Sequence, residues 1–522
     1  MFRPCVIPTL AICMCVVSPI ASAQGAKDVK RLTLHDAIQA ALANNLAIEV
    51  SRTNWRGAKE AGTLVEEAGF EFILGASGTG GWSKSGSSSN NPYNQPGIGS
   101  FDAETVTSSY SNNRNLSLSI QKAFTWGGSA QLSYSPRYSG SSSETSITFL
   151  DPTIDAIYRR TINSTPYSGS WGLSYSQNLL RGFGNKVNTA SLVIAQRGLV
   201  TADANFKRAV QDQVVAVESV YWNLVRAQMN LVNQRQSLEL AERLLKENQI
   251  RVETGILAPI EVTSSKASVA QREASIIQAE ADFQNAKDTF IRTVYSTTER
   301  PDDIELIDTP VVSQLTLEEK GAIETALKNR TELLNRRLEL ENAKLQEEVA
   351  QSNLKPTLSA SIAYNGSAQS SPSFGPINSD ITAFRYPGYN INVNFNMPLQ
   401  NKSARASDIR ARANRRASEL SLRDQELAIT LDVRTAYRNL LTAEKSIIAT
   451  EQSRILAQET YDAEQMRLTN GLSTNFVVSQ RQNELDNAKT VELNAKISYA
   501  NAQTALQQAM GTLLNHRNIR VQ

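Results

Sequence analysis

The chain has 522 residues, and 53 basic against 51 acidic side chains leave it almost neutral. That balance gives no general reason to expect nucleic-acid binding, which needs concentrated positive charge. Only two histidines, His35 and His516, are present, and all three cysteines, Cys5, Cys13 and Cys15, lie near the start. Since no metalloprotease, nucleophile-elbow or phosphate-loop spacing occurs, we expect no enzyme activity, no metal and no cofactor.

The first residues have the pattern of a secretory signal. Arg3 precedes an apolar stretch from Val6 to Ile20, and Ala21-Ser22-Ala23 follows as a cleavage site. We therefore expect residues 1–23 to be removed and the exported chain to lack cysteine. The rest of the sequence contains no run of eighteen apolar residues, so a membrane crossing would require β-strands closed into a barrel.

Most of the remaining sequence consists of two copies of one pattern. Residues 219–228, SVYWNLVRAQ, align with 435–444, TAYRNLLTAE, which stand 216 positions further on. Solenoid proteins repeat every 20–50 residues and need at least three units. The much longer period here predicts two large units, a first structural repeat over 24–300 and a second over 301–522.

In chain order, the first repeat is expected to open with a helix over about 35–69. Alternation of apolar and polar residues then predicts four strands within about 70–177. These strands are expected at about 70–82, 114–123, 129–138 and 167–177.

Long helices follow the strands. Residues 185–254 contain no proline and place an apolar residue at every seventh position from Val210 to Val252, which is typical of a coiled coil. A return helix is expected over about 258–296. The segment 297–315, with two prolines, predicts an irregular girdle that joins the repeats.

The second repeat is expected to contain two strands within about 357–396, at 357–365 and 387–396. A long helix over 402–470 follows, again without proline, and Arg454 interrupts its apolar seam.

The alternating strands, with Ser and Asn on one face, suit lipid on one side and water on the other. A soluble antiparallel sheet gives the same pattern, but the signal segment and the missing core partner favour the membrane. The polar segments 83–113 and 139–166 then suggest long loops, and TWGG at 125–128 a tight turn. Because eight strands is the practical minimum for a membrane barrel, six strands predict that several chains share one barrel.

The turns between the long helices are the candidate functional region. Gly255 and Gly471 suit left-handed helix ends, and Pro259 suits the first turn of a return helix. Simple hairpin turns account for all three residues. Glu261 is equally suited to a helix start, where the helix dipole favours an acid.

Together these features resemble the TolC family of outer-membrane efflux proteins. The resemblance rests on the duplicated halves, on the tips ETGILAPIEV and TNGLSTNFVV, on the helix entries SQNLLRGFGNK and MPLQNK, and on MGTLL at 510–514. It implies a mainly α fold with a membrane β-barrel. A trimeric α-helical periplasmic barrel would join a shared outer-membrane β-barrel built from the duplicated helix-strand-helix units. The family has four strands per chain, so with the hairpin around TWGG either the trimer barrel has eighteen strands or this hairpin lies outside it.

The resemblance also implies a function and partners. The homotrimer would sit in outer-membrane lipid, extend into the periplasm and serve as the exit duct of a tripartite efflux pump or type I secretion system. Its partners would be a periplasmic adaptor protein and an inner-membrane pump, and it would export small molecules or proteins. The alternative is a non-conducting, envelope-spanning coiled-coil protein.

The site residues follow from the same resemblance. Glu261 would form the periplasmic gate, whereas Val477 stands at the equivalent position of the second repeat, so a single acidic ring is implied. Ser473 stands where some members carry a basic residue that locks the closed state. The expected adaptor-docking tips are Arg251, Gly255, Leu257, Arg467, Gly471, Leu472 and Ser473.

Overall fold

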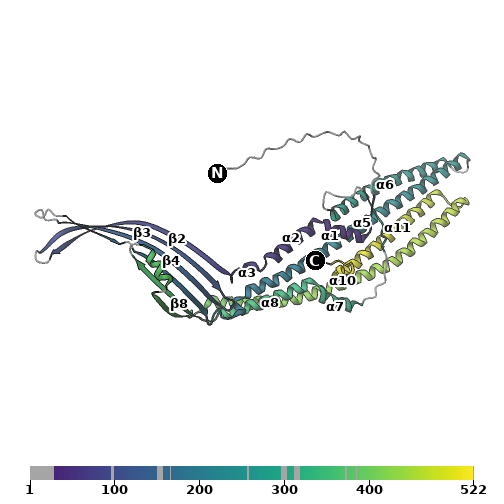
Figure 1. Ribbon diagram of the computed structural model, residues 1–522. Coiled ribbons are helices and arrows are strands. Elements are labelled where there is room, and N and C mark those ends of the chain that lie inside the picture. Colours follow the sequence, from purple (N-terminus) through teal and green to yellow (C-terminus); the bar gives the residue numbers. More distant parts are fainter. Residues whose placement is uncertain are drawn as a thin grey trace, which may run out of the picture. The chain divides into compact units, whose positions relative to one another are not determined.

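Figure 1 shows the chain in a computed structural model, which describes residues 29–95, 99–149, 157–164, 166–255, 258–295, 303–310, 318–370, 373–383 and 385–520. The chain divides into two compact units, each drawing on both predicted repeats. Unit 1 comprises Met1–Glu49, Asp212–Thr316 and Arg438–Leu506, and unit 2 comprises Val50–Gln211, Leu317–Tyr437 and Gln507–Gln522. Across the described ranges, no helix has the length and apolar character of a membrane span.

The predicted opening helix is divided into three: α1 (Leu34–Asn44), α2 (Leu46–Ala61) and α3 (Leu64–Ala68). Asn45 causes the first break, because its side-chain oxygen accepts hydrogen bonds from the backbone N–H groups of Ala47 (2.7 Å) and Ile48 (3.3 Å). An asparagine that caps its own backbone in this way starts a new helix. The prediction of one continuous helix was therefore wrong.

The other helices lie close to their expected bounds. In the first half these are α4 (Asn185–Asn188), α5 (Ala190–Glu253) and α6 (Pro259–Val294). In the second half they are α7 (Glu319–Asn329), α8 (Thr331–Ser352), α9 (Gly375–Thr382), α10 (Lys402–Thr469), α11 (Asn475–Ala509) and α12 (Leu513–His516). Within unit 1, α5 pairs with α6 and α10 with α11 as two helical hairpins (Figure 1). Ion pairs join each hairpin, from Arg235 to Glu280 at 2.8 Å and from Arg454 to Glu492 at 2.6 Å.

The predicted seam of α5 is buried at first and then drifts. Val217, Leu224 and Leu231 are buried, but the next seam residue, Leu238, is only half-buried. After Leu231 the buried positions of α5 are Ser237, Ala241 and Asn248. Rotation of about 20° per heptad is too small to move the buried face by a whole residue, which is about 100°. Ser237 is buried instead by its contacts with Asp486 and Gln482 of α11.

The segment predicted as an irregular girdle contains a strand. β7 (Asp303–Leu306) pairs in parallel with β1 (Val29–Leu32) in unit 1. The buried Tyr221 of α5 secures this pair, because its hydroxyl donates to the carbonyl of Leu32 and accepts from the N–H of Asp308, both at 3.3 Å. Burial raises the pKa of the Tyr221 phenol well above its usual range.

Tyr221→Phe should therefore flatten the loss of stability at alkaline pH. Above about pH 10 the unfolded chain ionises this tyrosine while the folded chain keeps it neutral, so the stability present below that pH is lost as the pH rises. The lost hydrogen bonds should also cost about 1–3 kcal/mol at neutral pH. Denaturant unfolding at about pH 8 and about pH 11 measures both effects. Tyr437→Phe, at the equivalent position of the other repeat, controls for removing a tyrosine as such. An alkaline decline that Tyr221→Phe leaves unchanged would contradict the assignment.

Unit 2 contains an antiparallel sheet with the order β2-β3-β4-β6-β8-β9, and β5 pairs with the far part of β4. The strands are β2 (Phe72–Gln95), β3 (Gly99–Ala123), β4 (Gly128–Phe149), β5 (Ile157–Ser164), β6 (Tyr167–Asn178), β8 (Thr357–Ser370) and β9 (Pro387–Asn396). All six predicted strands are present in one sheet, and the TWGG turn joins β3 to β4 within it.

The polar segments expected to be loops are largely strands. The ladder of β2 and β3 runs from Phe72↔Lys122 to Gln95↔Gly99, through the serine-rich stretch. Backbone pairing needs no apolar side chain, and serine and threonine hydroxyls meet across the strands, as Ser83 and Ser111 do at 2.7 Å. The loop prediction was therefore wrong for the described parts of 83–113 and 139–166.

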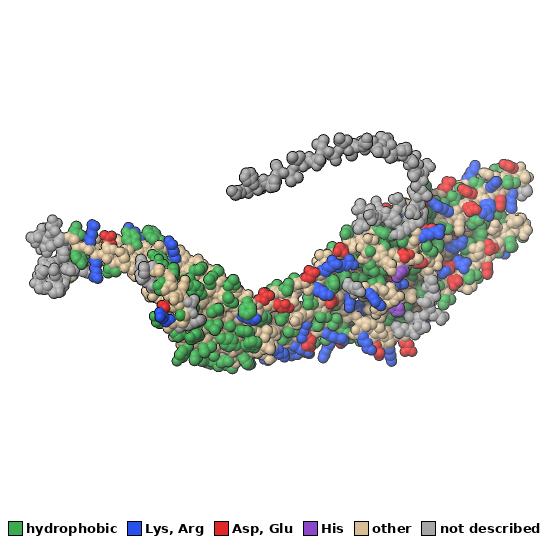
Figure 2. All heavy atoms as spheres, in the orientation of Figure 1, with side chains coloured by type: hydrophobic (Ala, Val, Ile, Leu, Met, Phe, Trp, Pro, Cys, Tyr) green, Lys and Arg blue, Asp and Glu red, His purple; other side chains and the backbone are tan. Residues whose placement is uncertain are grey.

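One face of the sheet is apolar where the strands adjoin the helices of unit 2. Its exposed side chains include Leu118, Leu132, Leu173, Ile362 and Val393, which the strand registers place in neighbouring rows. Figure 2 shows hydrophobic side chains covering this part of the sheet, with few charged groups among them. An exposed apolar surface of this extent predicts contact with lipid or with another protein.

Candidate functional site

The first tip is the turn between α5 and α6 in unit 1. Gly255 has a backbone φ of +76°, and its N–H donates to the carbonyl of Val252 at 3.0 Å. No other atom lies within 4 Å of the position a Cβ would take, so conformation rather than space favours glycine. Pro259 then opens α6 without a side-chain cap from Ala258.

The second tip, between α10 and α11, has the same backbone conformation at its glycine and more polar side-chain contacts. Gly471 has a φ of +75°, and the N–H of Leu472 donates to the carbonyl of Arg467 at 2.8 Å. The carboxylate of Glu464 pairs with Arg467 at 3.3 Å and accepts a hydrogen bond from the hydroxyl of Ser473. Ser473 thus fixes the turn to its own helix.

The two tips meet through Glu261. The side-chain amide of Asn475, at the start of α11, donates to the Glu261 carboxylate at 3.3 Å. Asn475 is buried, and its side-chain oxygen has no hydrogen-bond partner among the described residues. The structure therefore brings Glu261 to the second tip, where the sequence placed Val477 as its equivalent.

Beneath the tips, α10 and α11 share a small hydrophobic core formed by Tyr461, Leu468, Val478 and Leu485. A polar network lies beside it. The buried guanidinium of Arg272 in α6 contacts Asp486 at 3.1 Å and Asn483 at 2.9 Å, both in α11. Ser237 of α5 donates to the same Asp486 carboxylate at 2.6 Å. The network joins both hairpins across the interior of unit 1.

Burial governs the electrostatics of this network. Desolvation lowers the pKa of Arg272, and the charge of Asp486 opposes that effect. Desolvation also raises the pKa of Tyr461, and the neighbouring carboxylates of Asp462 and Asp486 add to the rise. Within the part of the chain that the structure describes, the Nε of Arg272 has no hydrogen-bond partner, so the guanidinium is only partly compensated.

The structure brings together most of the residues expected at the tips. Gly255 and Gly471 form the turns, Arg467 and Leu472 are exposed, and Arg251 is half-buried one turn before the first tip. Leu257 lies outside the described residues.

Sequence reasoning missed two exposed apolar side chains at the tips. Ile260 and Phe476 are 68% and 70% exposed, beside Leu472 at 78%. They follow the start of their return helices and stand 216 positions apart, so the repeat offset already paired them.

No cluster of three or more His, Cys, Asp or Glu side chains suited to a metal occurs among the residues that the structure describes.

Comparison with known proteins identifies the family of this chain. A sequence profile of the family "Outer membrane efflux protein" matches residues 129–292 and 322–512. The outer membrane protein TolC of Vibrio cholerae is 24% identical over 347 residues, 66% of this chain and 77% of that protein.

Solved channels share the fold. The outer membrane channel CmeC of Campylobacter jejuni superposes with a TM-score of 0.62 at 14% identity, over 92% of this chain and 86% of that one. The outer membrane protein VceC of Vibrio cholerae gives 0.59 at 16% identity, over 92% and 96%. These matches confirm the predicted fold class and the predicted resemblance. The chain belongs to the outer membrane efflux protein family and is an efflux channel of the outer membrane that extends into the periplasm.

Proposed function

We propose that three copies of this chain form one conducting channel, the exit duct of a tripartite efflux pump or type I secretion system. The observation that carries the proposal is the open sheet of unit 2. It has an exposed apolar face, and its outer strands β2 and β9 each pair on one side only among the described strands.

An open edge is costly in lipid, because unpaired backbone groups find no water there. β9 and β2 have opposite directions, so β9 of one copy can pair with β2 of the next as an antiparallel neighbour. Three copies of the six-strand path give an eighteen-stranded barrel. In this assignment residues 1–23 are the signal segment, and 24–300 and 301–522 are the two repeats of one protomer.

We assign the tips to the adaptor and the inner-membrane pump. Ile260, Leu472 and Phe476 expose apolar surface at turns that are otherwise polar, and apolar groups rimmed by charge are typical of protein contacts. Arg251, Gly255, Leu257, Arg467, Gly471 and Ser473 complete this docking region. The cargo is small molecules or proteins, handed over by the pump.

Cysteine pairs test the shared barrel, since the predicted exported chain contains no cysteine. Thr79→Cys on β2 is combined in turn with Asn390→Cys, Asn392→Cys or Asn394→Cys on β9. Oxidised membranes should give covalent species that stop at the trimer for the pair in register, and the purified trimer should conduct in planar bilayers. Ser174→Cys on the interior strand β6 replaces the β9 cysteine as the control. Covalent products that grow beyond three chains, or a monomer with an intact sheet, would refute the trimer.

Glu261→Gln should reduce the preference of the channel for cations. If three copies of Glu261 line the closed end, their charges attract cations into a narrow passage, and the amide keeps the side chain's shape and the contact with Asn475. The measurement is the reversal potential across a salt gradient. Glu253→Gln, at the exposed end of α5, is the matched control. Equal ion selectivity in both variants would contradict the gate role of Glu261 and leave it only the role of a helix-start residue.

A further inference from the structure

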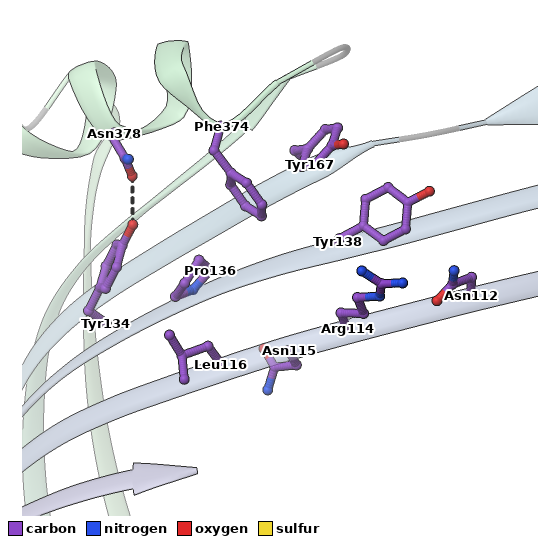
Figure 3. Close-up of a pocket in the computed structure, with 10 residues that line it drawn as sticks. All are labelled: Asn112, Arg114, Asn115, Leu116, Tyr134, Pro136, Tyr138, Tyr167, Phe374 and Asn378. Carbon is purple, nitrogen blue, oxygen red and sulfur yellow. Dashed lines mark hydrogen bonds between the residues drawn. The ribbon is translucent and has the colours of Figure 1, made fainter. Parts of the chain in front are cut away.

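The apolar face of the sheet contains a pocket midway along β3, next to α9. Its volume is about 660 Å³, and Figure 3 shows its walls on β3, β4 and β6 beneath the start of α9. The lining residues that matter here are Asn112, Arg114, Leu116, Tyr138, Tyr167 and Phe374. These strands are interior strands of the sheet, so the pocket lies away from the edges β2 and β9.

Local sequence explains the surroundings of the pocket. The backbone pairing of β3 with β4 is interrupted between Asn115↔Arg137 and Leu118↔Tyr134, at Pro136, which has no N–H to donate. On β6, a Cβ at Gly169 would lie 2.8 Å from Ile377 and from Ile381, so only glycine lets α9 approach this closely. The hydroxyl of Tyr134 also donates to the side-chain oxygen of Asn378 at 2.6 Å (Figure 3). These contacts fix α9 against β4 and β6 beside the pocket.

The pocket combines an aromatic wall with an unpaired cation. The rings of Tyr138 and Tyr167 lie 5.0 Å apart, and those of Tyr167 and Phe374 lie 4.6 Å apart in an edge-to-face arrangement. Arg114 stands directly opposite Tyr138 across the two strands. No hydrogen bond or ion pair joins the Arg114 side chain to another described residue. An unpaired guanidinium suits a phosphate or carboxylate ligand.

The position of Arg114 along β3 indicates which kind of phosphate or carboxylate ligand to expect. Lys122, which covers the ring of Phe72 at 4.1 Å, is the other cation on this face of β3, and only Leu116, Leu118 and Ile120 lie between the two. Eight residues span about 27 Å along a strand, or about 21 Å across a membrane at a tilt of about 40°. An apolar band about 25 Å tall, with aromatic residues at both rims, is the pattern of a membrane barrel. Arg114 and Lys122 thus mark its two borders.

We propose that this pocket binds the phosphorylated headgroup of a lipid in the outer leaflet, with Arg114 contacting the phosphate. Lys122 pairs with Phe72, which follows α3, so the Lys122 border faces the helices and the Arg114 border is the outer one. The acyl chains lie along Leu116, Leu118 and their neighbours, and the aromatic wall covers the headgroup. This inference rests on the proposed function, which places the apolar face against lipid.

The test uses the purified full-length protein in a non-ionic detergent, with lipid A carrying both phosphates as the probe. Native mass spectrometry measures its binding to the wild type and to Arg114→Gln. Removal of one cation near a lipid phosphate should lower the affinity about fivefold. Arg137→Gln is the matched control, because Arg137 is also exposed but lies on the opposite face, opposite Asn115. It should bind like the wild type.

Two further arms identify the ligand. Enzymatically dephosphorylated lipid A should bind the wild type about fivefold more weakly and should not distinguish Arg114→Gln from it. Inorganic phosphate at equal concentration should not displace the lipid, and displacement would show a free-anion site and overturn the lipid assignment. Equal binding by Arg114→Gln and Arg137→Gln would overturn the pocket itself. Both variants should keep the wild-type conductance, so a wild type that does not conduct would refute the proposed function rather than this inference.

Discussion

Leu224→Asp should abolish folding of the chain. Leu224 is 1% exposed in unit 1, close to the fully buried Val217 and Tyr221 in the seam of α5. Loss of a buried leucine costs about 2–5 kcal/mol, and a carboxylate without a partner in the same space adds a further penalty of several kcal/mol. Typical folded domains are stable by only about 5–15 kcal/mol. We expect no folded protein in the outer membrane, as measured by trimer yield and by circular dichroism after extraction.

Arg226→Asp is the control for this variant. It introduces the same carboxylate two residues further along α5, at an exposed position. A yield close to that of the wild type is expected there, because surface substitutions change stability by only about 0.5 kcal/mol. Leu440→Asp, at the equivalent and equally buried position in α10, should fail as Leu224→Asp does. Similar yields for Leu224→Asp and Arg226→Asp would show that the seam is wrongly placed.

The sequence predicted the helices well where their pattern was long and uninterrupted. The bounds of α10 differ by one residue from the expected 402–470. The absence of proline and the heptad pattern were the main basis of that prediction. The seam was predicted less well beyond Leu231, because burial there depends on contacts between the hairpins. Asp486 and Gln482 of α11 contact the buried Ser237, and a seven-residue count within α5 carries no information on that contact.

Local sequence patterns were not sufficient to predict the full length of the strands or the contacts of the site. Serine-rich stretches resembled loops, since their composition gives no periodic signal, yet the ladders that start in the apolar part continue through them. The tip glycines were predictable from their conformational role. The contact of Glu261 with Asn475 and the ion pair of Arg272 with Asp486 join segments more than 200 residues apart. Only the packing of the two hairpins brings them together.

Arg272→Met should lower the stability of unit 1 far more than the same substitution at an exposed arginine of this unit. The variant leaves the Asp486 carboxylate in a largely buried place with Ser237 as its remaining described donor. Removal of one partner from a buried ion pair typically costs about 3–5 kcal/mol. Arg243→Met removes one partner of an exposed pair with Glu239 and should cost less than about 1 kcal/mol. The free energy of unfolding, measured by denaturant with the helical signal as the probe, compares the two.

The double variant Arg272→Met/Asp486→Leu decides what the pair contributes. Replacement of a buried ion pair by apolar side chains of similar size is often neutral or stabilising, because neither charge must then be desolvated. The buried Nε of Arg272 has no hydrogen-bond partner in the described ranges, which lowers the net stabilisation from the pair further. We therefore expect Asp486→Leu to cost about as much as Arg272→Met, and the double variant to recover most of the loss. Losses that simply add would show that Arg272 and Asp486 act independently, and the network would then not be what joins the two hairpins beneath the tips.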